Sequence, residues 1–371
     1  MKKRILSILL LCCMVLIMLP TTVLAADGPM DTIPKYDVSI DVYNRTSDIS
    51  IKDSRSYYIY SSVPDKLRDT WAWDKKIFIK GDKAAPHVFI DGVNIKMSPS
   101  SKGPAIELNK KASAYLYFIG KDSTLQGADG RAAIQKNRSE GQLYVLARTG
   151  TTVTCKGGDK AAGIGGSYAT RNISNGYYNG DMYGHGVNMH FGSQSNPDYW
   201  GGIIAAIGGN GGAGIGGGQG GAGEKLYFYS GTIQATSDRF ASGIGGSYKG
   251  RGSEIYIYGG TVSAQGGEGG AGIGGGCWTT EQDMNGINAA HDIYISGGMV
   301  TAKGGYNGAG IGGGQYVPAR NITVTGGFVG VFRRGNKPSV LPRDSKTSGA
   351  TTKMARRMPS RKTLKREEPP V

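Results

Sequence analysis

Cysteine and histidine are scarce in this 371-residue chain, which has four of each. Cys12 and Cys13 lie near the N-terminus, and the remaining pair, Cys155 and Cys277, is separated by 122 residues. These numbers exclude a small disulfide-stapled scaffold and predict two small buried side chains, with a single bridge left open. The histidines have no zinc-ligand spacing and occupy positions 87, 185, 190 and 291. We therefore expect no metal site and no cofactor.

Long apolar runs are also rare, and the one that stands out lies at the N-terminus. Three basic residues at positions 2 to 4 precede an apolar core from Ile5 to Leu19, and a small-residue cleavage site ends at Ala25. This is the pattern of a secretory signal peptide, so residues 1–25 predict export. No later segment is apolar for the roughly 20 residues that a membrane-spanning helix needs, which favours a secreted or cell-surface protein.

Net charge is low everywhere except at the two ends. The chain carries a formal charge of +15, but residues 333–371 alone hold 12 Lys and Arg against 3 Asp and Glu. Little net charge remains on the central part, which excludes the basic surface of a nucleic-acid-binding protein. Residues 333–371 are also poor in apolar side chains, so we expect a disordered basic tail. Such a tail fits attachment to an anionic cell wall, or a solvated terminus without a partner.

Glycine, in contrast, is abundant, and a short glycine phrase repeats along the chain. Ala or Ser followed by Gly-Ile-Gly-Gly occurs five times, beginning at positions 162, 213, 242, 271 and 309. Ile215, Ile244 and Ile273 are 29 residues apart, and Ile311 follows after 38. Alternating strands separated by a glycine pair accompany the phrase. A fixed period of this kind is typical of a solenoid built from stacked repeats.

The repeat unit predicts a parallel β-helix. Each unit holds two or three alternating runs of 3 to 5 residues between glycine turns, and no stretch has a helical period. One unit cannot bury its apolar face alone, but stacked units can, so Ile255 should lie beneath Ile293. Weaker copies extend the pattern to about eight turns over residues 81–332. Residues 26–80, which contain the Trp71-Ala72-Trp73 pair, are expected to form an N-terminal cap over the first turn.

Two other glycine-rich motifs do not fit the sequence. A dinucleotide-binding fingerprint needs a helix directly after its glycines, and none follows here. The calcium-binding nonapeptide repeat needs a carboxylate ligand, and Ala213 and Ala271 stand in that place. The glycines therefore indicate tight corners between strands.

The landmarks between His87 and Gly166 resemble those of a known group. They are Phe-Ile-Asp-Gly-Val-Asn-Ile, Pro-Ala-Ile, Ala-Ala-Ile and Ala-Gly-Ile-Gly-Gly. The run is similar to the secreted β-helix proteins of Gram-positive anaerobes, some of which are carbohydrate-binding, and the resemblance covers roughly residues 75–331. It implies a right-handed parallel β-helix and a carbohydrate ligand for some members. Its motifs are structural, so it carries no catalytic residue to this chain.

The outward position of the first strand is aromatic in six of eight turns. We expect these side chains to lie about 4.8 Å apart in a ladder along one face. They are, in chain order, Phe89, Tyr117, Tyr144, Asn188, Tyr227, Tyr256, Tyr294 and Thr323. A neighbouring column, two residues later, reads Ile119, Leu146, Tyr229, Tyr258 and Ser296. Such rings serve packing alone, or they form an exposed stripe that binds sugar rings, and the sequence leaves both interpretations open.

Two insertions interrupt the period and add further candidate residues. Residues 167–202 are rich in Tyr and Asn and include Tyr199 and Trp200, and a shorter insertion after Gly276 carries Trp278. Insertions in a solenoid form loops, often on the binding side. Rings for stacking and amides for hydroxyl groups suit a neutral glycan site. An ordered loop without a ligand is the other interpretation.

Carboxylates are too sparse in the strands to predict catalysis. Hydrolysis of a glycosidic bond needs two carboxylates on facing positions, and elimination needs a base beside a cation. Glu254 and Asp292 occupy strand starts and Glu224 lies one residue out of register, which fits solvation of the sheet edge. We expect an exported, non-enzymatic protein that binds polysaccharide or glycoconjugate through its outward aromatic residues. An adhesin that binds a protein through the same face is the first alternative, and a polysaccharide lyase or glycoside hydrolase is the second.

Overall fold

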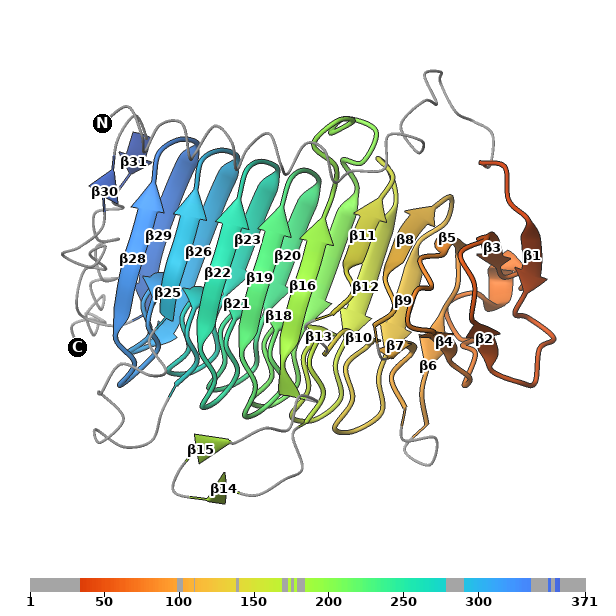
Figure 1. Ribbon diagram of the computed structural model, residues 1–371, viewed down its shortest axis with the longest axis horizontal. Coiled ribbons are helices and arrows are strands. Elements are labelled where there is room, and N and C mark those ends of the chain that lie inside the picture. Colours follow the sequence, from red (N-terminus) through yellow and green to blue (C-terminus); the bar gives the residue numbers. More distant parts are fainter. Residues whose placement is uncertain are drawn as a thin grey trace, which may run out of the picture. The chain divides into compact units, whose positions relative to one another are not determined.

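The chain coils into a right-handed parallel β-helix, which confirms the parallel β-helix predicted from its repeats and the right-handed form implied by the resemblance. Each complete turn, here called a rung, contributes one strand to each of three parallel sheets, while the first two rungs lack a strand of sheet C. Successive rungs lie side by side from the β1 end to the β28 end (Figure 1). The only helix among the described residues is the 3-10 turn η1 (Asp65–Leu67), and none is long and apolar enough to span a membrane. The computed structural model describes residues 34–98, 103–109, 111–137, 140–168, 173–174, 177–178, 184–277, 290–334, 346–347 and 351–353.

Sheet A contains eleven strands within the described residues, and its strands alternate between core-facing and outward-facing side chains. In stacking order they are β1 (Val38–Asp41), β3 (Ser56–Tyr60), β5 (His87–Asp91), β8 (Ala114–Ile119), β11 (Leu143–Ala147), β16 (Gly186–Phe191), β19 (Gly223–Phe228), β22 (Gly252–Ile257), β25 (Ala290–Ile295), β28 (Ala319–Val324) and β30 (Lys346–Thr347). All neighbouring pairs are parallel, so equivalent residues of successive rungs form straight columns.

Sheet B contains the repeated glycine phrase and has mostly two-residue strands. Its nine described strands are β2 (Ile49–Ile51), β4 (Ile77–Lys80), β7 (Ile106–Asn109), β10 (Ile134–Gln135), β13 (Ile164–Gly165), β18 (Ile215–Gly216), β21 (Ile244–Gly245), β24 (Ile273–Gly274) and β27 (Ile311–Gly312). Because every strand begins with isoleucine, these side chains pair in one continuous column, and each is at most 2% exposed. Burial of one such side chain contributes about 1.5–3 kcal/mol.

Sheet C follows sheet A and precedes sheet B along the chain in each complete rung. Its nine described strands are β6 (Ile95–Lys96), β9 (Ser123–Gln126), β12 (Thr152–Lys156), β17 (Ile203–Ile207), β20 (Thr232–Thr236), β23 (Thr261–Gln265), β26 (Met299–Tyr306), β29 (Phe328–Arg334) and β31 (Thr351–Lys353). A fourth sheet lies in the long insertion and consists of two antiparallel strands, β14 (Ile173–Ser174) and β15 (Tyr177–Tyr178). The two cysteines outside the N-terminal segment, Cys155 and Cys277, are free and buried, which confirms the expectation of two small buried side chains.

The predicted register of the core is confirmed. Ile255 pairs with Ile293, and Ile257 pairs with Ile295. The glycines of the phrase are required by close backbone packing, because Gly216 has a φ angle of +134° and a Cβ atom there would collide with the carbonyl oxygen of Gly245 on the next rung. A side chain at this position would be strained by both its backbone angle and its neighbour.

The expected N-terminal cap is wrong in its extent. β1 and β3 pair in parallel with each other and then with β5, while β2 and β4 lead into β7, so residues 38–80 form the first rungs themselves. Trp73 is 3% exposed and its indole Nε1 donates to the carbonyl oxygen of Arg45 at 2.8 Å, and Trp71 packs partly buried against the same core. These rungs were missed because they keep the alternation of strands but lack the glycine phrase.

Strand pairing also passes residue 332, the expected end of the β-helix. β29 continues to Arg334, β30 pairs with β28, and β31 pairs with β29. These strands and the N-terminal rungs explain why sheet A has eleven described strands where the repeats indicated about eight turns. The rest of the chain beyond Arg334 lies outside the described residues, so the disordered tail stays a prediction.

Candidate functional site

A continuous stack of aromatic rings runs along the outer face of sheet A. From rung to rung the ring centroids are 4.5–5.2 Å apart, and the ring planes are within 18° of parallel. The stack, here called the first ladder, consists of His87, Tyr115, Tyr144, His190, Tyr227, Tyr256 and Tyr294. The spacing follows from the separation of neighbouring strands.

Two residues predicted for this ladder belong to the column beside it. Strand pairing aligns Phe89 with Tyr117 and Tyr117 with Leu146, while His87 and Tyr115 take their places in the first ladder. The second ladder thus contains Tyr58, Phe89, Tyr117, Leu146, Tyr229 and Tyr258. Ile119, predicted for that column, aligns instead with Asp91. A shift of two residues keeps every side chain on its face, so alternation alone could not reveal the error.

The predicted ladder position of Asn188 is also wrong, because this residue sits in a backbone kink. Five consecutive rungs have a residue in the left-handed region there, with φ angles of 53–57°, namely Asn188, Lys225, Glu254, Asp292 and Asn321. The kink interrupts the alternation, so His190 and not Asn188 stacks between Tyr144 and Tyr227. The recurrence of Asn and Asp, which tolerate this conformation best, was the available sequence signal.

The kinked residues form a polar column beside the first ladder. The Asp292 carboxylate accepts a hydrogen bond from Asn321 Nδ2 at 3.0 Å, and its Oδ2 lies 2.8 Å from His291 Nδ1. Burial alone would raise the pKa of Asp292, but these hydrogen bonds outweigh it and lower the pKa. Glu224, one residue out of this column, is bound by Arg251 Nε at 2.6 Å.

The N-terminal half of the second ladder is buried and packs as a small outer core, whereas His87, Tyr115 and Tyr144 of the first ladder are half-buried beside it. Phe89 and Tyr117 are 8% and 4% exposed, and they cluster with Tyr58, Ile119 and Leu146. Trp200 lies over Tyr117 with ring centroids 5.2 Å apart, and Tyr199 meets Trp200 edge-on at 4.7 Å. Two candidate residues of the long insertion, Tyr199 and Trp200, therefore pack against the second ladder.

The C-terminal half of the ladders is open. Tyr227, Tyr229 and Tyr256 are half-buried, whereas Tyr258 and Tyr294 are 43% and 37% exposed. Most ring faces are covered by the rings of adjacent rungs, so the surface presents ring edges and phenol oxygens. Burial raises the pKa of Tyr227 to about 12, with a smaller contribution from Glu254, and keeps this phenol protonated.

A buried histidine and a buried lysine lie where the two halves meet. His190 Nδ1 lies 3.2 Å from the Tyr229 hydroxyl, and its Nε2 is buried without a hydrogen-bond partner among the described atoms. Burial, assisted by the charge of Lys136, lowers the pKa of His190 to about 4. Lys136 is 1% exposed and its ammonium donates to the carbonyl oxygen of Glu140 at 3.1 Å. Burial lowers its pKa to about 8, although the charge of Glu140 acts in the opposite direction.

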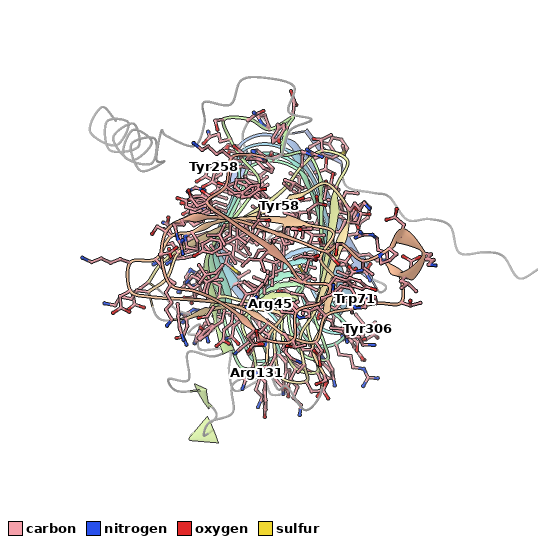
Figure 2. The ribbon with its side chains drawn as sticks, turned by 90° about the vertical axis from the view of Figure 1, so that its right-hand side faces the viewer. Arg45, Tyr58, Trp71, Arg131, Tyr258 and Tyr306 are labelled. Carbon is pink, nitrogen blue, oxygen red and sulfur yellow. The ribbon has the colours of Figure 1, made fainter. Side chains whose placement is uncertain are left out.

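A concave site, missed by sequence reasoning, lies at the corner that follows sheet C. The segments that follow β20 and β23, together with the C-terminal part of β26, enclose a groove of about 490 Å³. Its lining includes four charged side chains and one exposed ring, from Asp238, Arg239, Glu268, Lys303 and Tyr306. Tyr306 and Tyr258 lie on different sides of the β-helix when it is viewed along its length (Figure 2). The parts of the chain that the structure describes contain no cluster of three His, Cys, Asp or Glu suited to a metal ion.

Some predicted candidates cannot be placed. Trp278 lies outside the described residues, as do the side chains at positions 169–183 of the long insertion. The structure places the remaining predicted candidates. Phe89 and Tyr117 lie in the buried part of the second ladder, and Tyr199 and Trp200 lie beside it. Tyr144 stacks in the first ladder, and the other five tyrosines form the open half.

Comparison with known proteins identifies the repeat. Residues 229–248, 255–277 and 293–315 match a family model described as Beta helix repeat. No curated protein and no solved structure gives a match. The three matched segments come from consecutive rungs, and they contain four of the open ladder residues, Tyr229, Tyr256, Tyr258 and Tyr294.

Proposed function

We propose that this parallel β-helix repeat protein is an exported, non-catalytic protein that binds polysaccharide through the open half of its ladders. Three consecutive rungs bring five tyrosines into one partly exposed aromatic surface, formed by Tyr227, Tyr229, Tyr256, Tyr258 and Tyr294. Contiguous aromatic surfaces of this kind mark sites of interaction. Repetition of the same groups along the β-helix axis suits an extended polymer better than a single sugar.

The geometry restricts how a sugar would be held on this surface. Since Tyr256 is stacked between Tyr227 and Tyr294, a sugar ring meets its edge and hydroxyl, not its face. A phenol donates one hydrogen bond and accepts others, which suits the hydroxyl groups of a polysaccharide. The adjoining carboxylates of Glu254 and Asp292 add stronger acceptors along one side.

The ionisation of Asp292 makes this carboxylate unsuited to act as the general acid of a glycosidase. A glycosidase needs a carboxylic acid whose raised pKa lets it protonate the leaving group. Hydrogen bonds from Asn321 and His291 instead hold the pKa of Asp292 below its ordinary value. We expect incubation with polysaccharides to release no new reducing ends and no unsaturated products.

The test is retention of the purified chain on a panel of insoluble and soluble polysaccharides. The variant with Tyr227, Tyr256 and Tyr294 changed to serine should lose saturable retention. The control variant Tyr316→Ser removes a tyrosine that is 40% exposed and lies outside sheet A, and it should bind as the unmodified chain does. Circular dichroism and thermal melting check that each variant is folded. Lack of retention on every polysaccharide, with the chain folded, would contradict the proposal and direct attention to protein partners.

Export and surface attachment belong to the same proposal. The predicted signal peptide at residues 1–25 should be removed on secretion, which mass spectrometry of the secreted protein measures directly. The basic segment 333–371 should add binding to anionic cell wall that weakens as salt concentration rises. Salt-independent attachment would exclude this role for the segment.

A further inference from the structure

The groove at the corner after sheet C is built from matching positions of three consecutive rungs. One wall consists of Gln265, the last residue of β23, and Lys303 of β26, which pair in register. The other wall consists of Arg239, Glu268 and Tyr306. Arg239 pairs with Glu268, and the Gly269 N–H donates to the carbonyl oxygen of Tyr306 at 2.9 Å, so these three residues form a column.

The floor of the groove is bare backbone. Glycine pairs at 266–267 and 304–305 lie between the walls and are buried. A Cβ atom on Gly305 would collide with the carbonyl oxygen of Gly267, so packing between rungs keeps the floor free of side chains. The preceding rung has Ser237-Asp238 at this place, and the exposed Asp238 side chain therefore marks one end of the groove.

The ring of Tyr306 is presented differently from the rings of the ladders. Its exposed fraction is 58%, larger than that of Tyr258 or Tyr294, and it projects from the rim of a concave site. In the ladders, rung-to-rung stacking covers the ring faces. Tyr306 thus offers the flat apolar platform that the ladders lack.

The charges on the lining balance. The lining carries two carboxylates, Asp238 and Glu268, and two cations, Arg239 and Lys303, and the described structure contains no ion pair among these four. Carboxylates accept hydrogen bonds, and guanidinium, ammonium and amide groups donate them, so the walls complement a ligand rich in hydroxyl groups. A polyanionic or polycationic ligand would meet like charges at two of the four positions.

We propose that this groove binds a short segment of a neutral hexose chain, with one sugar ring resting on Tyr306 and its hydroxyl groups bonded to Glu268 and Arg239. The choice of ligand class rests on the proposed function, but the site is separate from the ladders. The volume of about 490 Å³ falls within the range of roughly 300–1,000 Å³ of small-ligand sites. The groove selects single chain ends or short segments, and the ladders hold the length of the polymer.

The experiment is isothermal titration of the purified chain with three neutral hexasaccharides, cellohexaose, laminarihexaose and mannohexaose, and with a hexamer of galacturonate. We expect one neutral hexasaccharide to bind at least tenfold more tightly than the galacturonate hexamer, with little dependence on salt. Tyr306→Ala should weaken that binding about tenfold, as loss of an aromatic anchor typically does. Glu268→Gln should weaken it severalfold, since the amide keeps the shape but not the charge.

Controls separate the groove from the ladders. Gln234→Ala removes an exposed side chain of sheet C outside the groove and should change nothing. The triple serine variant of Tyr227, Tyr256 and Tyr294 should lose retention on polysaccharide but keep its affinity for the hexasaccharide within about twofold.

Each contrary result has a distinct meaning. Unchanged hexasaccharide affinity in folded Tyr306→Ala and Glu268→Gln variants would overturn the proposal that the groove is the binding site. Absence of binding to all three neutral hexasaccharides, with ladder-dependent retention on polysaccharide intact, would also overturn the groove while leaving the proposed function standing. Preference for the galacturonate hexamer would overturn the neutral ligand class. Absence of both hexasaccharide binding and polysaccharide retention would overturn the groove proposal and the proposed function together.

Discussion

The imidazole ring of His190 lies face to face with the phenol ring of Tyr227, with centroids 4.5 Å apart and planes 9° from parallel. Its other face stacks on Tyr144 at the same separation. His190 thereby joins the half of the first ladder that lies beside the Trp200 cover to the half that is open. A neutral imidazole packs in this position as an aromatic ring, and protonation would place a charge in a site that is largely closed to water.

Acid should therefore destabilise the fold before its carboxylates are protonated. His190 has a pKa of about 4 in the folded chain and about 6.5 when unfolded, so the unfolded state binds more protons between these values. Stability from this group is complete above pH 6.5 and is lost as the pH falls toward 4. The loss between pH 7 and pH 5 should be about 2 kcal/mol, measured by urea unfolding at each pH.

His190→Phe keeps a ring in the stack and removes the titration. Its unfolding free energy should fall much less between pH 7 and pH 5 than that of the unmodified chain. Tyr256→Phe is the matched control, because it alters the same ladder without removing a histidine, and its pH dependence should be unchanged. Equal pH dependence in His190→Phe and the unmodified chain would contradict the assignment of this loss of stability to His190.

Lys136→Met should stabilise the protein at pH 7. Lys136 is 1% exposed, and burial lowers its pKa to about 8, so the folded chain holds its ammonium group at a cost. Methionine keeps the apolar stem and removes the charge, and we expect a gain of about 1–3 kcal/mol in unfolding free energy. Lys156→Met, at an exposed position in sheet C, should change stability by less than about 0.5 kcal/mol. A lower melting temperature for Lys136→Met would refute the prediction.

Gly216→Ala should disrupt the stacking of rungs. It combines a φ angle of +134° with a collision against the Gly245 carbonyl oxygen, and we expect a loss of more than about 3 kcal/mol. Gly150→Ala has a similar backbone penalty at a φ angle of +86°, but nothing lies within 4 Å of its new Cβ atom. Its loss should be about 1 kcal/mol. Similar melting temperatures for the two variants would show that backbone strain alone, without the collision, accounts for the effect.

Trp200→Ala should separate packing from binding in the ladders. Removing the indole that lies over Tyr117 should cost about 1–2 kcal/mol of stability, since Trp200 is only partly buried. Retention on polysaccharide should be unaffected at a temperature where the variant is folded, because the open tyrosines lie on other rungs. Loss of retention in the folded variant would move the binding face toward the covered half.

The stacking of the core could be predicted from the sequence because its residues repeat with a fixed period. Ile244 and Ile273 are 29 residues apart and pair directly, so the spacing in the chain equals one turn of the β-helix. The outer face obeys weaker rules. Tyr117 was placed beside Tyr144 because either of two registers keeps both side chains outside, and only the backbone pairing decides between them.

The groove was not predicted because its lining combines the ends of sheet C strands with the corners that follow them, and no residue type recurs there from rung to rung. Arg239, Glu268 and Tyr306 follow one another at 29 and 38 residues, the same spacing as Ile244, Ile273 and Ile311, but they share no residue type that would mark a common site. Their alignment depends on hydrogen bonds between successive corners, such as that from the Phe240 N–H to the Glu268 carbonyl oxygen at 2.9 Å. The glycine pairs of the floor can be recognised in the sequence. That they form the floor of a groove becomes clear only when the structure shows which side chains flank them.

Both surfaces draw on the same repeat, since residues 252–277 supply Tyr256 to the open ladder and Glu268 to the groove. Tandem duplication of one such unit would lengthen the ladder and extend the glycine floor by the same step of one strand spacing, about 4.8 Å. The number of copies is thus a single genetic variable that sets the footprint of the protein on a polymer. Related chains with more or fewer copies would present longer or shorter binding surfaces with the same spacing between equivalent residues.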